Sequence, residues 1–408
     1  MARPDVNIAL TNNRLGRLPA EADGTMGLIA SGVAIAGQIV LGEVYGPFRS
    51  IKEVEAKGIT QAWGIANKSL AWHHCNEFFD EAQSATPLYL MLVAATVTMA
   101  EMGDKLQPYA KKMIEGTSGA VRMVGLSRVP DVSYTPVYAG ELDPDVVAAL
   151  AKLKDLQAEQ FALHRPIRFV VEGRAWGGDA SATTDLRNPT TGPRCNMAGV
   201  VLGQSKEVAD ADAAFGGYAF VGRVLGRFAR IQVQRSIGRV KDGPIGTVNA
   251  NMSDGTAMDQ LTNIEVNVLH DKGFIFALSY PDQPGWYFNG GHAACPIDDD
   301  YSDLKDGRTI DKAARITYDT YVVEILDDVE VDTATGLLPL AVCKFYEGIV
   351  EAAIGTRMAG NISGVGAYVD PAQNIVQTGV LNVQVDVVKR GTIEHFSVEL
   401  GFATNIAQ

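Results

Sequence analysis

Two short segments of this sequence bring together residue types that bind metal ions. Residues 73–75 read HHC, and residues 298–303 read DDDYSD. Neighbouring positions on a helix point about 100° apart, so the first three side chains cannot easily share one ion. The acidic segment lacks the alternating carboxylates, the glycine and the distal glutamate of a calcium-binding loop. We therefore predict no metal site in either segment, and a solvated turn for the aspartates.

Motifs for nucleotide binding or nucleophilic catalysis are incomplete. The segment GGYAFVGRVLG (216–226) has a GxxxxG spacing, but a phosphate-binding loop also needs a Lys-Ser/Thr pair, and a dinucleotide site needs GxGxxG. The serines in GLSRV and GQSKE do not stand in a G-x-S-x-G elbow. We therefore expect no catalytic residue and no cofactor. The glycines indicate a helix that packs closely against a neighbour.

Arginines give the middle of the chain a basic character within an acidic total. The simpler interpretation is scattered surface salt bridges, each of which stabilises the fold little. The alternative is pairing between subunits. The arginines concerned are Arg168, Arg174, Arg187, Arg194, Arg223, Arg227, Arg230, Arg235 and Arg239.

Four further basic residues lie at spacings of three or four: Lys305, Arg308, Lys312 and Arg315. Residues at these spacings line one face of a helix. Such a face is either solvated or in contact with a partner, and the sequence leaves both open.

Composition limits the class of protein. A chain of 408 residues with 47% hydrophobic and 20% charged residues is expected to fold into two or three globular domains. The net charge of −13 disfavours binding to nucleic acid or anionic membranes. No apolar run has the length of a membrane span, and the start lacks a signal-peptide pattern, so we expect synthesis and folding in the cytoplasm. The four separated cysteines predict free thiols.

The order of predicted elements gives an α/β fold, with α+β character towards the end. Val6, Ile8 and Leu10 alternate with polar residues and predict an N-terminal strand. Strand and helix patterns then alternate up to Leu261. Among them are a helix after Ser50 with Glu53 as a capping box, and a long helix with Asp143 as its N-cap.

A second domain is expected after Leu261. It begins with a short helix and two strands, followed by a long helix from about Thr309 and another after Gly336. The end of the chain alternates as β-strands do, and its last two runs, joined around KRG (389–391), predict a hairpin. Val398, Leu400 and Phe402 lie on one side of the final strand.

This order of elements resembles the contractile tail sheath family. RPDVNIALTNNRLGRLP resembles the family's opening arm, and GPFRSIKEVEAKGI its early helix. LHRPIRFVVEGR and AFVGRVLGRFARIQVQRSIGRVKDGPI are similar to the middle of a phage sheath subgroup. GWYFNGGHAA before YSDLKDGRTIDKAARITYDTYVV resembles the approach to the first long helix, and GAYVDPAQNIVQTGVLNVQVDVVKRGTIEHFSVELGF the closing region.

The resemblance implies a subunit of two domains. Residues 1–20 form an arm that joins a discontinuous inner domain, residues 21–261 form an inserted outer α/β domain, and residues 262–408 complete the inner domain with a terminal strand hairpin. Val6, Ile8, Leu10, Val398, Leu400 and Phe402 would supply the strands of two arms that pair with neighbouring subunits. An exposed strand edge offers unpaired backbone groups that another chain can satisfy.

The resemblance also implies a structural function without enzyme activity. The subunit would form a homo-oligomeric sheath around a tail tube, contact baseplate and tail terminator proteins, and contract to drive the tube through a target envelope. It would belong to a phage tail or phage-like particle assembled in a bacterial cytoplasm. Lys305, Arg308, Lys312 and Arg315 would then be candidates for a tube contact. The alternatives are a nucleotide-using α/β enzyme and another ring-forming tail component.

Overall fold

The computed structural model describes residues 22–131 and 133–402, which form two compact units. The first unit ends at Asp311 and the second begins at Lys312. None of the described helices is both long and apolar enough to cross a lipid bilayer. Each unit is described separately below.

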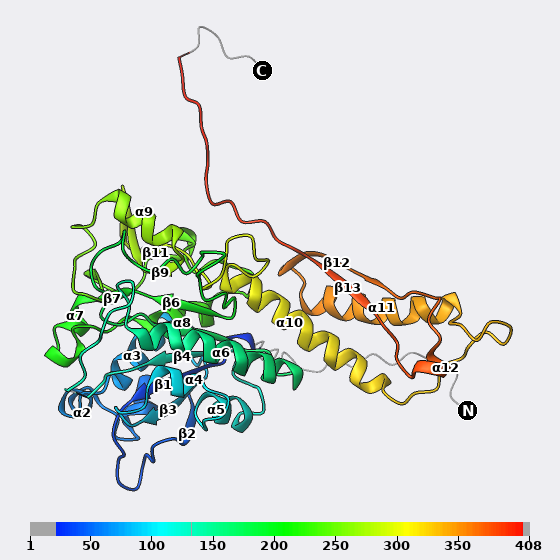
Figure 1. The fold of residues 1–408 in the computed structure, drawn as a ribbon, viewed down its shortest axis with the longest axis horizontal. Coiled ribbons are helices and arrows are strands. Elements are labelled where there is room, and N and C mark those ends of the chain that lie inside the picture. Colours follow the sequence, from blue (N-terminus) through cyan, green and yellow to red (C-terminus); the bar gives the residue numbers. More distant parts are fainter. Residues whose placement is uncertain (1–21, 132, 403–408) are drawn as a thin grey trace, which may run out of the picture. The chain divides into compact units, whose positions relative to one another are not determined.

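A seven-stranded sheet forms the centre of the first unit (Figure 1). Its order is β2-β3-β1-β4-β5-β6-β9, and every pairing is parallel except that between β2 and β3. The strands are β1 Met26–Ser31, β2 Val44–Phe48, β3 Leu88–Val93, β4 Met123–Ser127, β5 Arg168–Glu172, β6 Ala198–Val201 and β9 Phe274–Ile275. Strands on both sides of β1 give the order of a doubly wound sheet. The predicted α/β class is confirmed.

Helices and small sheets surround this central sheet. The helices are α1 Ile51–Glu55, α2 Gln61–Ala66, α3 Ala71–Glu81, α4 Met99–Gly103, α5 Ala110–Gly116, α6 Pro144–Ala162, α7 Lys206–Ala209, α8 Val221–Arg230 and α9 Asn263–Asp271. Two further antiparallel pairs are β7 Gly203–Ser205 with β8 Ala250–Met252, and β10 Ala277–Tyr280 with β11 Gln283–Phe288. Short 3-10 turns lie at Ala22–Gly24, Ala213–Phe215 and Val240–Asp242.

Helices cover both faces of the central sheet, which explains why its inner strands are buried and mostly apolar. β1, β4 and β5 are buried along their whole length, as expected of parallel strands between two helical layers. On one face, Met113 of α5 lies where a Cβ on Gly27 would stand. On the other face, Val221 and Leu225 of α8 lie against Gly125.

The ends of the helices only partly follow the sequence signals. The cap of α6 is confirmed, because the Asp143 carboxylate accepts a bond from the Asp145 N–H and Pro144 is the first helical residue. The capping box predicted for Ser50 and Glu53 is wrong. The Ser50 side chain makes no cap bond, and the Glu53 carboxylate instead accepts from the Arg49 N–H at 2.8 Å.

The boundary between the compact units lies later than the change of sequence pattern at Leu261. Residues after this point still belong to the first unit, because β9 extends the central sheet through parallel pairs of Phe274 with Val200 and Ile275 with Val201. The turn-rich sequence and the short strand patterns after Leu261 indicated a change in local structure. They did not reveal the long-range pairing of β9.

The second unit consists of helices and a two-stranded sheet. Its elements are the end of α10 Leu304–Tyr321, a 3-10 turn at Val322–Glu324, α11 Leu340–Arg357, β12 Ile362–Tyr368, α12 Ile375–Thr378 and β13 Gln384–Lys389. A small core is formed by Leu338, Cys343, Tyr346 and Val369. Helix α10 begins about one turn before the predicted start at Thr309.

The terminal hairpin predicted around residues 389–391 is wrong for the single chain. β13 pairs in antiparallel fashion with the preceding strand β12, with Val365 opposite Val387 and Ala367 opposite Val385. Residues 391–402 have no secondary structure. Figure 1 shows this segment leaving the sheet as an extended red trace.

Candidate functional site

The segment after β13 exposes a regular series of large apolar side chains. We call residues 391–402 the C-terminal arm. Within it, Val398 is 76% exposed, Leu400 97% and Phe402 fully exposed, and Phe396 continues the series at the same spacing of two. Alternation of this kind is typical of a strand that buries one face. The predicted arm residues Val398, Leu400 and Phe402 therefore lie on an extended segment without a partner strand among the described residues.

The residues predicted for the other arm, Val6, Ile8 and Leu10, lie outside the described residues. Their pairing with a neighbouring subunit stays a prediction.

The β12–β13 sheet has one face that this chain leaves open. Val365, Ala367, Val385 and Val387 are partly buried, and α11 packs beside β12. On the opposite face, a Cβ added at Gly364 or Gly366 would meet no atom within 4 Å. A sheet of only two strands is marginally stable by itself and gains from additional strands.

The four basic residues predicted to contact a tube all lie in α10, but three of them are largely buried. Lys305 donates to the Asp303 carboxylate at 2.9 Å, and the Arg308 guanidinium lies 5.2 Å from the centre of the Phe228 ring. In the second unit, Lys312 donates to the Asn361 side chain at 3.1 Å. Arg315 is partly exposed. The spacing predicted a shared helix correctly, whereas the tube contact stays a prediction.

The carboxyl ends of β1, β4 and β5 are the place where doubly wound folds bind ligands. Here this edge is filled by the chain's own polar groups. Nε2 of His74 lies 2.8 Å from Oγ of Ser127, and the Glu172 carboxylate accepts from the N–H groups of Arg128 and Ala219. Burial raises the pKa of Glu172. The arrangement ties β4 and β5 to the neighbouring segments, which is a structural role.

Beside this edge, α3 and α8 are joined by a buried cluster of charges. Glu81 of α3 accepts from Nη1 of Arg223 at 3.1 Å and from Nε of Arg227 at 3.0 Å, and also from the Gly246 N–H at 2.6 Å. Glu77, one turn earlier, accepts from the Tyr218 hydroxyl at 3.0 Å. All of these charged side chains are almost fully buried.

Close approach of α3 and α8 depends on two glycines. A Cβ at Gly222 would stand 2.1 Å from the His74 carbonyl oxygen, and a Cβ at Gly226 would stand 2.5 Å from that of Phe78. The interpretation of this segment as a closely packed helix is confirmed, although α8 is shorter than the pattern suggested.

The surface-salt-bridge interpretation of the arginines is wrong for four of them. Arg168 forms two bonds of 2.7 Å with Asp311, and Arg174 lies 2.9 Å from Asp143. Together with Arg223 and Arg227, they are buried against carboxylates of the same chain. Sequence reasoning missed this cluster. One signal was available, since Glu77 and Glu81 repeat the four-residue spacing of Arg223 and Arg227.

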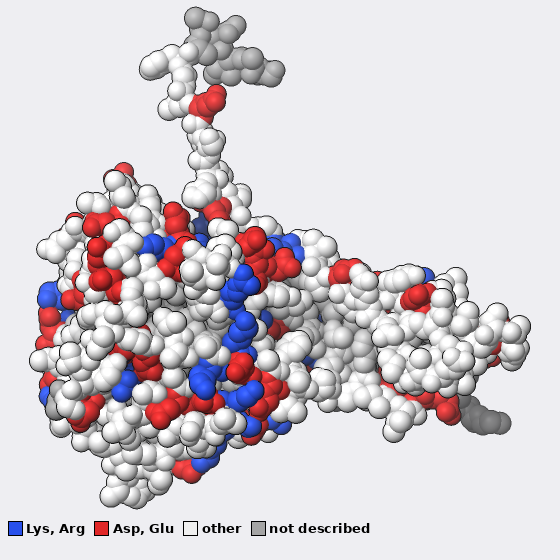
Figure 2. Space-filling view, viewed as in Figure 1, with Lys and Arg blue, Asp and Glu red and all other residues white. Residues whose placement is uncertain are grey.

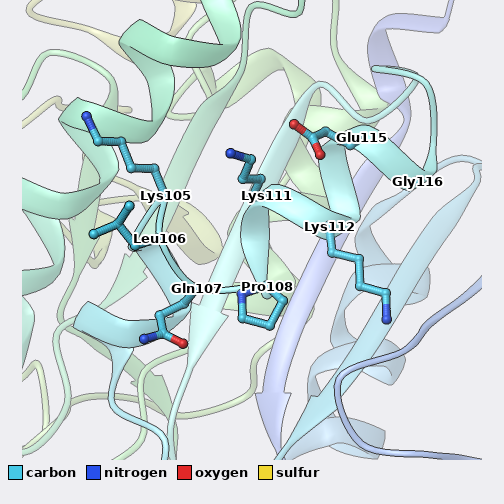
Figure 3. A pocket seen from close by; sticks show the side chains of 8 residues that line it. All are labelled: Lys105, Leu106, Gln107, Pro108, Lys111, Lys112, Glu115 and Gly116. Atoms are coloured by element: carbon cyan, nitrogen blue, oxygen red, sulfur yellow. The ribbon is translucent and has the colours of Figure 1, made fainter.

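The charged side chains that remain at the surface are of mixed sign. Figure 2 shows Lys and Arg interspersed with Asp and Glu over the first unit, whereas the visible face of the second unit is mostly uncharged. A shallow pocket of about 390 Å³ in the first unit is lined by Lys105, Leu106, Gln107, Pro108, Lys111, Lys112, Glu115 and Gly116 (Figure 3). Two of its lysines are already paired, Lys111 with Glu159 and Lys112 with Glu43.

The HHC segment, which combines residue types that bind metal ions, lies in α3. His73, His74 and Cys75 are buried in α3. Within residues 22–131 and 133–402, no three His, Cys, Asp or Glu side chains are grouped as metal ligands. The prediction of four free thiols is confirmed, and each thiol is buried. Burial raises the pKa of Cys195 to about 11 and that of Cys295 to about 12.

The fold is that of contractile tail sheath proteins. A chain from the six-fold symmetrised anti-feeding prophage baseplate superimposes with a TM-score of 0.61 at 12% identity, over 99% of this chain and 100% of that one. A chain from the contracted sheath complex of the extracellular contractile injection system PVC gives 0.59 at 11% identity, over 99% and 98%. The contracted anti-feeding prophage baseplate gives 0.54 at 12% identity, over 98% of each chain. The predicted resemblance is confirmed at the level of the fold.

Among curated proteins, none matches the chain in sequence. Two family models do match it. The DUF2586 N-terminal domain covers residues 3–292, and the DUF2586 C-terminal domain covers residues 300–407. The break between the two matches falls close to the beginning of α10. The chain belongs to the DUF2586 family.

Proposed function

We propose that this chain is the subunit of a contractile tail sheath, which polymerises around a tail tube and contracts to drive the tube through a target envelope. The observation that carries the proposal is the C-terminal arm. It combines exposed alternating apolar residues with a neighbouring two-stranded sheet, in a chain that has the sheath fold. An extended segment and an incomplete sheet are complementary between copies.

In this proposal the two units have separate roles. The second unit and the arms, including Val6, Ile8 and Leu10, form the inner domain beside the tube, and the first unit forms the outer domain. Residues 262–311, which the sequence had placed in the inner domain, go with the outer domain because β9 belongs to the central sheet.

Contraction needs no catalytic group in the subunit. Copies would exchange one set of interfaces for another of lower free energy, while paired arms keep neighbours connected during the movement. The partners would be other copies, the tube, and the baseplate and terminator proteins of a phage tail or phage-like particle assembled in a bacterial cytoplasm. The buried carboxylates and arginines at the sheet edge support a structural role rather than the alternative of an α/β enzyme.

The proposal is tested by electron microscopy of the purified full-length chain under conditions that favour assembly. Long hollow cylinders are expected. A chain that stops after Arg390 should form none, because it lacks the arm. A chain with Leu400→Asp should also form none, because it carries a charge in the middle of the arm's apolar face. Glu399→Ala is the matched control, since it changes the opposite face. Equal cylinder formation by the Leu400→Asp and Glu399→Ala chains would contradict the proposed role of the arm.

The tube contact is tested at Arg315, the partly exposed member of the four basic residues. Reversing the largely buried Lys305, Arg308 or Lys312 is expected to disturb folding itself. Arg315→Glu should reduce assembly around purified tubes and leave tube-free cylinders unchanged. An unchanged yield of tube-filled cylinders would remove Arg315 from the contact.

A further inference from the structure

The loop between α10 and α11 exposes apolar side chains beside carboxylates. We call residues 322–332 the acidic loop and residues 230–241, which follow α8 in the first unit, the basic segment. We infer that the acidic loop of one copy binds the basic segment of another copy. This inference rests on the proposed sheath function and adds a contact between copies that does not involve the arms.

The acidic loop presents large apolar side chains to solvent. Leu326 is 98% exposed, and Val323 and Ile325 are exposed as well. The backbone of Leu326 has a φ of +68°, a conformation that favours glycine. Neither the local backbone nor the core of the second unit therefore accounts for a leucine at this position. Exposed apolar residues with a polar rim are typical of a protein contact.

The same loop has negative charge that its own unit does not balance. No lysine or arginine lies between Arg315 and Lys344 in the sequence. Asp319 and Glu347 are paired with Arg357 and Lys344, respectively. By contrast, the carboxylates of the loop have no lysine or arginine nitrogen within 4 Å among the described residues of the second unit. They belong to Glu324, Asp327, Asp328, Glu330 and Asp332.

The basic segment carries the opposite charge. It contains Arg230, Arg235, Arg239 and Lys241 and no aspartate or glutamate. Arg230 and Lys241 are exposed, and no carboxylate of the described first unit lies within 4 Å of either. Arg235 and Arg239, whose side chains are 40% exposed, share Oδ1 of Asp242 at 3.9 and 2.7 Å. The segment therefore keeps a positive charge in a chain whose net charge is −13.

The basic segment is a fixed part of the first unit. Ile231, Val233 and Ile237 are buried. Directly after the segment, the guanidinium of Arg227 donates to the carbonyl oxygens of Gly243 and Pro244 at 3.0 and 2.8 Å. A surface that is already ordered loses little conformational entropy when a partner binds.

A second copy is the partner that suits both surfaces. Each copy has one acidic loop and one basic segment, so a polymer can pair every loop with a segment. Complementary charges of this kind fix which surfaces meet and in which register. The contact also gives a role to Arg230, Arg235 and Arg239, which stay exposed whereas four other arginines of the middle region form buried pairs.

Cross-linking with a carbodiimide tests the contact directly, because the reagent joins an amine to a carboxylate that touches it. Lys241 is the only lysine of the basic segment. Cylinders are assembled from equal amounts of isotopically labelled and unlabelled chain, and the linked peptides are identified by mass spectrometry. We expect Lys241 to be linked to carboxylates of the acidic loop, with labelled and unlabelled peptides joined to each other. Lys241→Arg keeps the charge and should remove these links.

Three cross-linking results would overturn the inference. Cylinders without any link from Lys241 to the acidic loop would remove the contact. Links that never join a labelled to an unlabelled peptide would assign the loop to the basic segment of its own chain. Links from the loop to a lysine of the tube, formed in place of those to Lys241 when tubes are present, would assign the loop to the tube.

Charge reversal tests the same contact through assembly. Asp327→Lys with Asp328→Lys reverses the loop, and Arg230→Glu with Lys241→Glu reverses the segment. Each pair of changes should raise the critical concentration for cylinder assembly about tenfold, because repulsion replaces attraction. The four changes together make the charges opposite again and leave the net charge of the chain as it was. They should return the critical concentration to about that of the unmodified chain.

Two control variants separate the contact from net charge and from folding. Asp271→Lys with Asp298→Lys alters exposed carboxylates of the first unit, changes the net charge as the loop variant does, and should leave the critical concentration unchanged. Leu326→Gly suits the local backbone and removes the exposed side chain, so it should raise the critical concentration without unfolding the chain. A fourfold variant that assembles no better than either reversed pair, or reversed pairs that assemble as well as the unmodified chain, would refute the inference.

Two outcomes separate this inference from the proposed function. Cylinders of the unmodified chain without a Lys241 link between copies would overturn the inference alone and leave the sheath function standing. Absence of cylinders from the unmodified chain would reject the sheath function and the inference with it.

Discussion

Glu81 is the carboxylate on which the contact between α3 and α8 depends most. It accepts from Arg223, Arg227 and the Gly246 N–H, and all three charged side chains are at most 4% exposed. Glu81→Ala removes the common acceptor and leaves two guanidinium groups buried beside each other. The substitution therefore tests whether the charge cluster stabilises the first unit.

The expected effect is large. Removing one partner of a buried ion pair typically costs about 3–5 kcal/mol, because the remaining charge loses its compensation without regaining water. At about 2 °C per kcal/mol for a domain of this size, the midpoint of thermal unfolding should fall by roughly 6–10 °C. Asp210→Ala is the control. It breaks the exposed Lys206–Asp210 pair and should cost no more than about 1 kcal/mol.

Tryptophan fluorescence measures this effect in the first unit alone. All four tryptophans, Trp63, Trp72, Trp176 and Trp286, precede Asp311. Urea and thermal unfolding followed by this signal are therefore not mixed with unfolding of the second unit. A free energy of unfolding that falls by less than about 1 kcal/mol for Glu81→Ala, as for the control, would refute the assignment of Glu81 as a buried compensating charge.

Three further predictions use the same fluorescence signal or the free thiols. Gly222→Ala should destabilise the first unit by about 1–3 kcal/mol through overpacking, since its Cβ would stand 2.1 Å from a carbonyl oxygen. Gly116→Ala is the control, because its Cβ would meet no atom within 4 Å. Equal losses of stability in the two variants would contradict close helix packing. Burial, and after it the charge of Arg187, lowers the pKa of His292 well below 6.5, so the unfolded state binds a proton that the folded state does not, and stability should be lost as the pH falls below about 6.5. His292→Gln should reduce the slope of stability against pH by up to one proton. An unchanged slope would assign the loss of stability to other groups. Buried Cys195 and Cys295 should react with a thiol reagent at pH 8 only after unfolding; fast reaction of the native chain would show that these thiols are accessible.

Local signals predicted much of the fold. Asp143 followed by Pro144 gave the beginning of α6 correctly, because a cap depends on a few adjacent residues. The glycines at 222 and 226 correctly indicated close packing of a helix. The alternating residues near the C-terminus gave a strand at β13 and the exposed apolar series of the arm.

The errors concern partners distant in sequence. The sequence pattern predicted that β13 pairs with the segment that follows it, but β13 pairs with β12, which precedes it in the chain. Alternation specifies that a strand has a buried face and leaves its neighbour undetermined. Arg223 and Arg227 were likewise interpreted as members of surface salt bridges, because nothing near them in sequence reveals Glu81, which lies more than a hundred positions earlier.

The pairing of β9 with β6 also decides where the chain can be divided into fragments. A fragment that ends at Leu261 lacks β9, so Val200 and Val201 lose their strand partners and the edge of β6 becomes free to pair with another chain. A fragment that ends at Asp311 keeps β9 and with it the complete central sheet. The shorter fragment should therefore aggregate through its exposed strand edge, and the longer one should not.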